Sequence, residues 1–392
     1  MQQKTSKLLI FILALLVVFC PLGIDLYLPA FVNMQQDLAV SEAQIQQTVG
    51  IYMLAVGLGQ LLAGPLADKY GRRPVALSGI LLFGSGALLA TLLDEWHWIM
   101  VARVLQGLGA CATFVSAFAI VRDSFGHKGS GQMITYLNGI VCFIPALAPI
   151  LGAWLTLEFG WRSNFTFLSG FAAIGLILVL ALYRETKPES TVYSGHLLDL
   201  RRFRPMLSSP QFMFNACITM VGMAAMLVFV VGAPGWLMTQ LGRPVEEFTM
   251  WFTINAAISI AASFIAPHFI KRNSQQALRF GLSLFTLGGV LLLLAPHSHP
   301  LAYLLPMYLA SIGFAFTLGA AAGNALAPFA NQAGTASALI GVMQMSGAGL
   351  LAMLSQPLAL PAPQQLAVHL LLGLPFLCLL FSRCKDNLHS PA

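Results

Sequence analysis

GPLADKYGRR, residues 64–73, is a short charged segment between two long apolar runs, near 46–66 and 75–93. A helix needs about 20 apolar residues to cross the hydrocarbon core of a bilayer, and each run has about this length. The charged segment is therefore interpreted as a loop at a membrane surface, where Gly64 and Gly71 allow a tight turn close to neighbouring helices. This part of the sequence predicts a helical membrane protein.

The same apolar pattern extends along all 392 residues, which are 58% hydrophobic and only 9% charged. An average soluble protein is about 25% charged, so a soluble domain is excluded. Glycines, prolines and charge clusters divide the chain into twelve apolar segments, which predict an all-α integral membrane protein with twelve transmembrane helices. The other ten segments lie near 8–30, 97–120, 132–157, 164–183, 211–236, 248–270, 277–295, 301–323, 335–358 and 366–382.

Basic residues are distributed unevenly between the two sides of the predicted membrane. With the N-terminus placed inside, all but three of the 20 lysines and arginines fall in inner loops and tails; the exceptions are Arg103, Arg162 and Arg243. Because inner loops are enriched in Lys and Arg, we expect both termini in the cytoplasm. The same bias explains the net charge of +6 without a nucleic-acid partner.

The longest loop, 184–209, is basic and polar, and it divides the twelve segments into two groups of six. We predict an N-terminal six-helix half at 1–183, a cytoplasmic linker at 184–209, a C-terminal six-helix half at 210–383 and a cytoplasmic tail at 384–392. Two groups of six around a linker are typical of transporters built from repeated halves.

Two charged residues lie inside the apolar segments. Asp25 is the only one of the 14 aspartates and glutamates placed there, and Arg103 is the only basic residue. Such residues are costly in hydrocarbon, usually face a cavity or a partner, and mark ion or proton pathways. Asp25 lies about five residues and Arg103 about six residues from the outer ends of their segments, or roughly 7 and 9 Å. We expect the two side chains at similar depth in a proton pathway.

The segment 64–73 contains an aspartate and glycines at specific positions, which a generic basic loop does not need. Asp68 can face the N-terminus of a helix, and Arg72 can pair with a carboxylate, for which Asp123 is the candidate. The segment strongly resembles the G-x-L-A-D-x-x-G-R-[RK] signature of the major facilitator superfamily. The candidate gating residues are Gly64, Asp68, Gly71, Arg72, Arg73 and Asp123.

Two other stretches resemble motifs of the same superfamily. RVLQGLGA at 103–110 is similar to R-x-x-Q-G-x-G-A, which the family links to proton transfer, although Arg103 could instead snorkel towards the outer surface. NGIVCFIPALAPILGA at 138–153 is similar to the fifth-span antiporter motif, with Ala153 in place of the usual last glycine. Prolines bend a helix and small residues allow close helix contact. The candidate residues of this motif are Gly139, Pro145, Pro149 and Gly152.

Together with GIDLYLP at 23–29, IVRD at 120–123 and FGWR at 159–162, these motifs resemble the bicyclomycin/chloramphenicol-resistance branch of the drug:proton antiporters. The resemblance covers essentially the full length. It implies alternating access and efflux of small lipophilic drugs, including chloramphenicol-like compounds, in exchange for protons across the bacterial inner membrane. It gives Asp25 the role of proton-binding carboxylate and Arg103 that of its functional neighbour. It implies a monomer in the lipid bilayer that uses the proton gradient and needs no cofactor or metal.

Polar residues elsewhere in the segments can form helix–helix hydrogen bonds or contact a substrate. Our candidates for lining a substrate cavity are Tyr52, Gln106, Asn138 and Asn215. A proton-coupled transporter of a single metabolite, as exporter or importer, stays open as an alternative. An enzyme is not expected, because one intramembrane carboxylate without a histidine cluster supplies neither a paired nucleophile and base nor a metal site.

Overall fold

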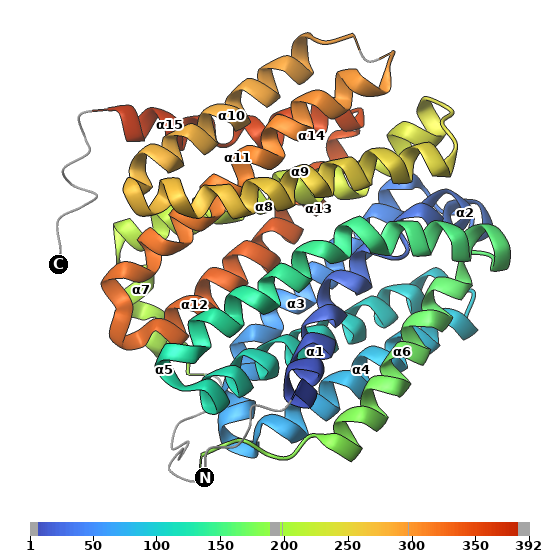
Figure 1. Cartoon of the computed structure of the whole chain (residues 1–392). Coiled ribbons are helices and arrows are strands. Elements are labelled where there is room, and N and C mark those ends of the chain that lie inside the picture. Colours follow the sequence, from blue (N-terminus) through green and yellow to red (C-terminus); the bar gives the residue numbers. More distant parts are fainter. Residues whose placement is uncertain (1–6, 189–196, 198, 297, 383–392) are drawn as a thin grey trace. The chain divides into compact units, whose positions relative to one another are not determined.

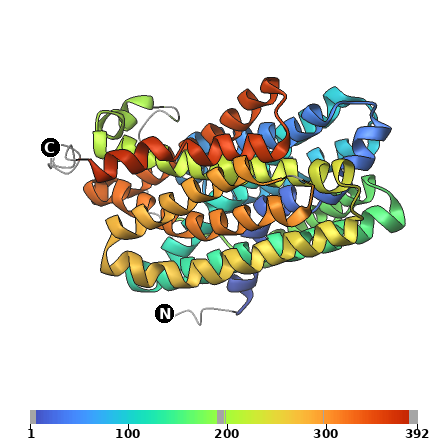
Figure 2. The same ribbon diagram turned by 90° about the horizontal axis from the view of Figure 1, so that it is seen from above.

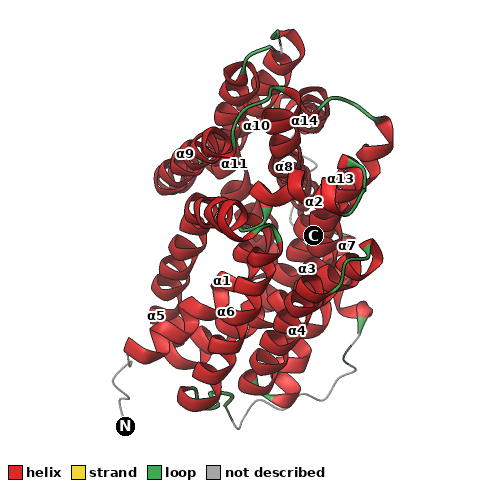
Figure 3. Ribbon diagram, turned by 90° about the vertical axis from the view of Figure 1, so that its right-hand side faces the viewer, coloured by secondary structure: helices red, strands yellow, loops and turns green. Residues whose placement is uncertain are grey.

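The computed structural model describes residues 7–188, 197, 199–296 and 298–382, and this part of the chain consists of helices and loops without a strand (Figure 3). Within it, 12 helical stretches are long and apolar enough to cross a membrane, which confirms the predicted fold class. The predicted tail at 384–392 and residues 189–196 and 198 of the predicted linker lie outside the described residues.

The chain divides into two compact units, Met1–Asp199 and Leu200–Ala392. The first unit contains α1 (Lys7–Asp25), η1 (Leu28–Ala30), α2 (Phe31–Asp37), α3 (Glu42–Tyr70), α4 (Arg72–Leu92), α5 (Trp96–Phe159) and α6 (Arg162–Leu182). α5 leaves helical geometry at Gly126 and holds two spans, Trp96–Gly126 and Gly129–Phe159. α5 packs against α1, α3 and α4, and α6 packs against α4 (Figure 1).

The first span is broken, which the sequence analysis did not predict. α1 ends at Asp25, the chain turns at Leu26 and Tyr27, and the helix restarts through η1 and α2 as far as Asp37. Pro29 fits this restart, because proline has no N–H to donate and its fixed φ suits the first turn of a helix. The span runs to Asp37 rather than to residue 30. Asp25 therefore lies deeper in the span than the five residues predicted.

The second unit supplies the other six spans. Its elements are η2 (Leu200–Phe203), α7 (Arg204–Leu207), α8 (Pro210–Pro234), the π-helix η3 (Gly235–Gln240), α9 (Val245–Arg272), α10 (Ser274–Leu294), α11 (Pro300–Leu326), η4 (Ala327–Gln332), α12 (Ala333–Val342), the π-helix η5 (Met343–Gly347), α13 (Ala348–Ser355), η6 (Gln356–Leu358), α14 (Ala362–Leu371) and α15 (Leu374–Phe381). α11 packs against α8, α9 and α10, and α14 packs against α8 and α10. Figure 2 shows the yellow and orange helices, α9 to α11, running alongside one another.

Each unit has its own aromatic core and an apolar outer surface. Phe19 and Phe83 pack edge to face at 5.0 Å in the first unit, and Phe229 stacks on Phe252 at 5.7 Å in the second. Large apolar side chains such as Ile177 and Leu294 are exposed. In water such a surface would aggregate, so it fits a protein whose helices face lipid.

Candidate functional site

Asp25 is a buried carboxylate in the first span. Its side chain is 5% exposed at the break between α1 and η1. Within the described residues it takes part in no hydrogen bond and no ion pair. Burying an ionised carboxylate without a partner costs several kcal/mol, at an order-of-magnitude level, whereas a protonated carboxyl group costs far less. The free-energy cost of burying Asp25 therefore depends on whether its carboxyl group is protonated.

Arg103 is fully buried in the first span of α5, and most of its polar atoms have partners. Its Nε donates to the carbonyl oxygen of Thr48 at 3.2 Å, and its Nη1 donates to Oε1 of Gln106 at 2.7 Å. Nη2 has no hydrogen-bond partner among the described residues. The snorkelling alternative is therefore not supported, because the guanidinium is held inside the helix bundle.

Two tyrosines complete the surroundings of Arg103. Its guanidinium carbon lies 4.6 Å from the ring centroid of Tyr27 and 4.3 Å from that of Tyr52, within the range of cation–π attraction. The Tyr27 hydroxyl shares a 2.7 Å hydrogen bond with that of Thr48. The Tyr52 hydroxyl donates to the carbonyl oxygen of Cys20 in α1 at 2.8 Å. These contacts tie Arg103 to both α3 and α1.

The structure does not join the two intramembrane charges directly. Both residues are described, and no ion pair links Asp25 to Arg103. Their connection runs through Tyr52, which contacts the guanidinium with its ring and α1 with its hydroxyl. The sequence analysis missed Tyr27 as a partner, although it stands in the quoted GIDLYLP stretch. Its aromatic ring beside a charged residue in an apolar segment was the available signal.

The antiporter motif reaches the break in the first span through Gly152. A Cβ atom at Gly152 would collide with the carbonyl oxygen of Leu26, the residue that follows Asp25. Only glycine permits this approach of two backbones. Pro149 is buried and Pro145 half-buried in the same helix. The structure thus places one end of the predicted motif, Gly152, against the first span beside Asp25.

Gly139, by contrast, has no atom within 4 Å of where its Cβ would lie. The same is true of Gly64 in the segment 64–73. Neither glycine is therefore required by a close contact in this structure. The prediction that the whole segment 64–73 is a loop was wrong, because α3 continues to Tyr70 and the chain turns at Gly71.

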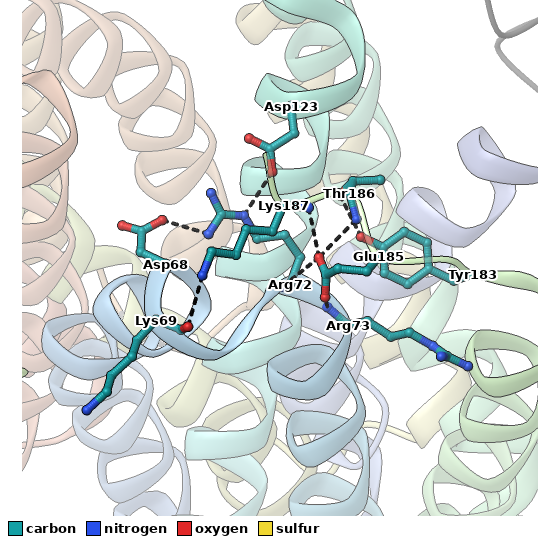
Figure 4. A network of polar contacts seen from close by, with 9 residues as sticks. All are labelled: Asp68, Lys69, Arg72, Arg73, Asp123, Tyr183, Glu185, Thr186 and Lys187. Carbon is teal, nitrogen blue, oxygen red and sulfur yellow. Dashed lines mark hydrogen bonds and ion pairs between the residues drawn. The ribbon is translucent and has the colours of Figure 1, made fainter. Parts of the chain in front are cut away.

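Arg72 is the centre of a polar cluster at one end of the first unit (Figure 4). Its Nη1 lies 2.6 Å from Oδ1 of Asp68, and its Nε lies 2.9 Å from Oδ2 of Asp123. The ion pair expected between Arg72 and Asp123 is present, and Arg72 itself is buried. One guanidinium therefore joins the end of α3, the start of α4 and the end of the first span of α5.

Glu185, which follows α6, completes this cluster and was missed by the sequence analysis. Its carboxylate accepts the backbone N–H groups of Arg72 and Arg73, both at 3.0 Å, and those of Thr186 and Lys187, both at 2.9 Å (Figure 4). It therefore caps the N-terminus of α4 from a distance of more than a hundred residues along the chain. A sequence signal existed, because α4 begins after Gly71, which has no side chain to cap it.

Gly71 makes room for this cap. Its φ of 107° and ψ of 160° are costly for any other residue, and a Cβ there would clash with Oε2 of Glu185. The partial shielding of the exposed Glu185 carboxylate from water would raise its pKa, but the four backbone N–H donors outweigh this effect and hold the pKa below its ordinary value. Lys187 adds a bond from Nζ to the carbonyl oxygen of Lys69 at 2.9 Å. We call Asp68, Arg72, Arg73, Asp123 and Glu185 the Arg72 cluster.

A second polar cluster joins the loops that follow the first, third and fifth spans. Trp161 Nε1 donates to Oδ2 of Asp37 at 2.8 Å, and Arg162 pairs with both Asp37 and Asp94. Since each span crosses the membrane once, these loops lie at the end of the first unit opposite to the Arg72 cluster. Trp161 and Arg162 of the FGWR stretch thus link three loops at this end of the first unit.

The predicted cavity residues differ in their surroundings. Tyr52 and Gln106 are fully buried and engaged as described above. Asn138 is exposed on α5. Asn215 is buried on α8, where its Nδ2 donates to the carbonyl oxygen of Gln211 at 2.8 Å and its Oδ1 has no partner in the described part of the chain.

No metal site is found among the residues that the structure describes, where no group of three or more His, Cys, Asp or Glu side chains could hold an ion. Within the spans, the described charged side chains of the site are the Asp25 carboxylate and the Arg103 guanidinium.

Comparison with known proteins matches residues 13–352 to the sequence model of the Major Facilitator Superfamily. The chain is 33% identical over 362 residues to the multidrug resistance protein MdtL of Salmonella schwarzengrund (strain CVM19633), covering 91% of this chain and 90% of that protein. It is 33% identical over 346 residues to MdtL of Escherichia fergusonii, covering 88% and 87%.

Solved structures share the fold. The structure is similar to that of a D-xylose-proton symporter with a TM-score of 0.76 at 14% identity, covering 96% of this chain and 98% of that one. A peptide transporter, POT, gives 0.76 at 15% identity, with coverage of 95% and 93%. The helices, the motifs and the relatives agree, and the chain belongs to the Major Facilitator Superfamily, whose members are multi-pass membrane transporters and not enzymes.

Proposed function

We propose that this protein exports small lipophilic drugs, chloramphenicol-like compounds among them, across the bacterial inner membrane in exchange for protons, with both termini in the cytoplasm. The observation that carries the proposal is Asp25, a buried carboxylate without a hydrogen bond or ion pair in the described chain. The name of the MdtL relatives, multidrug resistance protein, supports the substrate class. A monomer that uses the proton gradient, with no cofactor, suffices for this mechanism.

The coupling step is a proton transfer at the Asp25 carboxylate. When the site faces outside, a proton from the medium binds a carboxylate oxygen and the charge disappears, so the drug leaves. When the site faces inside, the proton passes to water, the carboxylate is ionised again and the next drug binds. One O–H bond forms and breaks, and no other covalent bond changes. Drug and proton thus compete for one state of the transporter.

Arg103 acts in this proposal as a positioning residue. Its guanidinium is fixed by Thr48 and Gln106 and contacts the ring of Tyr52. Because the Tyr52 hydroxyl donates to the carbonyl oxygen of Cys20 in α1, a shift of α1 on protonation of Asp25 would move Tyr52 and alter its contact with Arg103. The residues of the antiporter motif would respond through Gly152, which packs against Leu26.

The Arg72 cluster is the proposed gate of the first half. Breaking the contacts of a buried arginine leaves uncompensated charge and costs roughly 3–5 kcal/mol, which is enough to bias a conformational equilibrium. Arg72→Ala and Asp68→Asn should each slow transport more than they weaken drug binding. Transport at the wild-type rate in both variants would remove the gating role.

For the substrate cavity we retain Asn138 and Asn215 as proposed contacts. Tyr52 and Gln106 are engaged around Arg103 here, so we propose that they reach substrate only in a state that separates α1 from α3.

The decisive test measures drug transport in proteoliposomes with an imposed pH gradient. A panel of lipophilic drugs, chloramphenicol included, is compared for the wild type and Asp25→Asn, which keeps size and polarity but cannot ionise. We expect gradient-driven transport in the wild type and its loss in the variant, with weaker drug binding, because the neutral amide mimics the protonated carboxyl group, and with thermal unfolding retained. Full gradient-driven transport by Asp25→Asn would refute the coupling role. Failure of every drug, with proton-driven transport of one metabolite, would favour the single-substrate alternative.

A further inference from the structure

A crevice of about 700 Å³ lies within the second unit, between α9, α10 and α11. α9 and α10 are joined by Asn273 alone, yet each packs more closely against α11 than against the other (Figures 1 and 2). Two helices that share a third support without closing on each other leave a wedge between them. The volume is in the range of about 300–1,000 Å³ typical of ligand sites.

The walls of this α9–α10 crevice are apolar. Phe316 on α11 is buried, and its ring lies 5.8 Å from that of Phe269 on α9 and 5.0 Å from that of Phe280 on α10. Phe269, Phe280 and Ile265 are exposed. The three aromatic rings line an apolar groove, which suits a hydrocarbon chain.

One end of the crevice is cationic. Arg272, at the end of α9, lines it together with Asn273 and Gln276. The Arg272 side chain is exposed and makes no ion pair in the part of the chain that the structure describes. The sequence contains no aspartate or glutamate between Glu247 and Asp386, so the helices around the crevice offer no carboxylate to it. Among the described residues Arg272 thus has no carboxylate partner on these helices, and an anion from the bilayer can meet its charge.

We infer that the α9–α10 crevice binds an anionic phospholipid, with its phosphate at Arg272 and an acyl chain along Phe316. The observations favour an amphiphile, because an apolar groove ends at a cation that makes no ion pair with the described residues. The bilayer that surrounds these helices supplies such a molecule, and basic pockets between transmembrane helices bind anionic headgroups. Lys271, next to Arg272, adds positive potential. A neutral drug would use the apolar walls and leave the charge unpaired. This inference does not depend on the proposed transport function.

The test titrates the delipidated full-length protein with phosphatidylglycerol or phosphatidylcholine of identical acyl chains and counts bound lipids by native mass spectrometry. One basic residue at an anionic surface contributes about 1 kcal/mol, which corresponds to a preference of about fivefold for phosphatidylglycerol. Arg272→Gln should lower this preference to the smaller contribution of Lys271. Arg204→Gln, which removes another exposed arginine of the second unit outside the crevice, should retain it.

A second pair of variants tests the groove. Ile265→Trp fills the crevice from its exposed side, so it should lower the affinity for both lipids severalfold while the protein still folds. Leu294→Trp adds the same bulk at an exposed site outside the crevice and should change neither affinity.

Three results would overturn the inference: equal affinity of the wild type for the two lipids, an unchanged preference in Arg272→Gln, or displacement of phosphatidylglycerol by a lipophilic drug that binds the wild type and Arg272→Gln equally well. The last result would assign the crevice to the drug.

Discussion

Truncation of Glu185 should loosen the first turn of α4. In Glu185→Ala, the N–H groups of Arg72 and Arg73 lose the acceptor that now lies 3.0 Å from each. Loss of an N-terminal cap costs about 0.5–2 kcal/mol. Because Glu185 is exposed, water replaces part of this interaction, and we expect about 1 kcal/mol. That free energy corresponds to an about fivefold larger population of the open turn.

Gly71→Ala should have a larger effect through the same contact. The backbone at Gly71, φ 107° and ψ 160°, costs roughly 1–3 kcal/mol for a residue with a side chain. The new methyl group would also displace the Glu185 carboxylate. Since truncation of Glu185 removes that clash, the double variant should be less destabilised than the sum of the two single variants, by about 1 kcal/mol.

The assay is hydrogen exchange by mass spectrometry on peptides that cover the start of α4, with thermal unfolding of the purified protein as a second measurement. Glu185→Gln keeps an acceptor without the charge and should fall between the wild type and Glu185→Ala. Glu158→Ala removes an exposed carboxylate outside the Arg72 cluster and serves as the control. Unchanged exchange at the start of α4 in Glu185→Ala, or strict additivity in the double variant, would refute the capping argument.

Three further predictions follow from the same geometry. The pKa of Glu185 is lowered in the folded protein, so the stabilisation that its carboxylate provides is complete above the ordinary pKa of 4.5 and is lost as pH falls through the lowered pKa. Hydrogen exchange at the start of α4, corrected for its intrinsic pH dependence, should therefore be constant at neutral pH and rise only in strong acid. Gly152→Ala should destabilise the protein by roughly 1–3 kcal/mol and slow transport, because its methyl group meets the carbonyl of Leu26, whereas Gly139→Ala, which has open space, should change neither thermal unfolding nor transport. Arg103→Lys keeps the charge but loses the planar fork, so the free energy of unfolding should fall by about 1–3 kcal/mol; an unchanged melting temperature would contradict the hydrogen bonds assigned to that side chain.

The twelve spans could be predicted because a bilayer imposes a length and excludes unpaired polar groups. Both constraints act along the chain and need no knowledge of neighbours. The first span shows where such counting fails. Leu26, Leu28 and Ala30 are as apolar in the break as they would be in a helix, so hydropathy did not reveal the break at Asp25. Pro29 was its only local sign.

The candidate site was predicted in parts. Arg72 and Asp123 were expected to pair, because the motif places each at the same end of a span, and the structure contains the pair. Asp25 and Arg103 were predicted at similar depth, but the first span runs to Asp37, so Asp25 lies deeper than the residue count indicated. Depth also does not specify rotation about the helix axis. In the structure the Arg103 guanidinium contacts Thr48, Gln106 and two tyrosine rings.

The sequence by itself determined the number of helices, the family motifs and the two charges that must be accommodated in the membrane. These features follow from composition and residue spacing, which can be read along the chain without knowing which residues are in contact. Only the tertiary structure decided that Glu185 caps α4, that Gly152 meets the first span beside Asp25 and that Arg272 lies at the end of an apolar crevice. Such contacts join residues far apart in the chain, and their geometry depends on how the helices rotate and cross, which residue spacing does not encode.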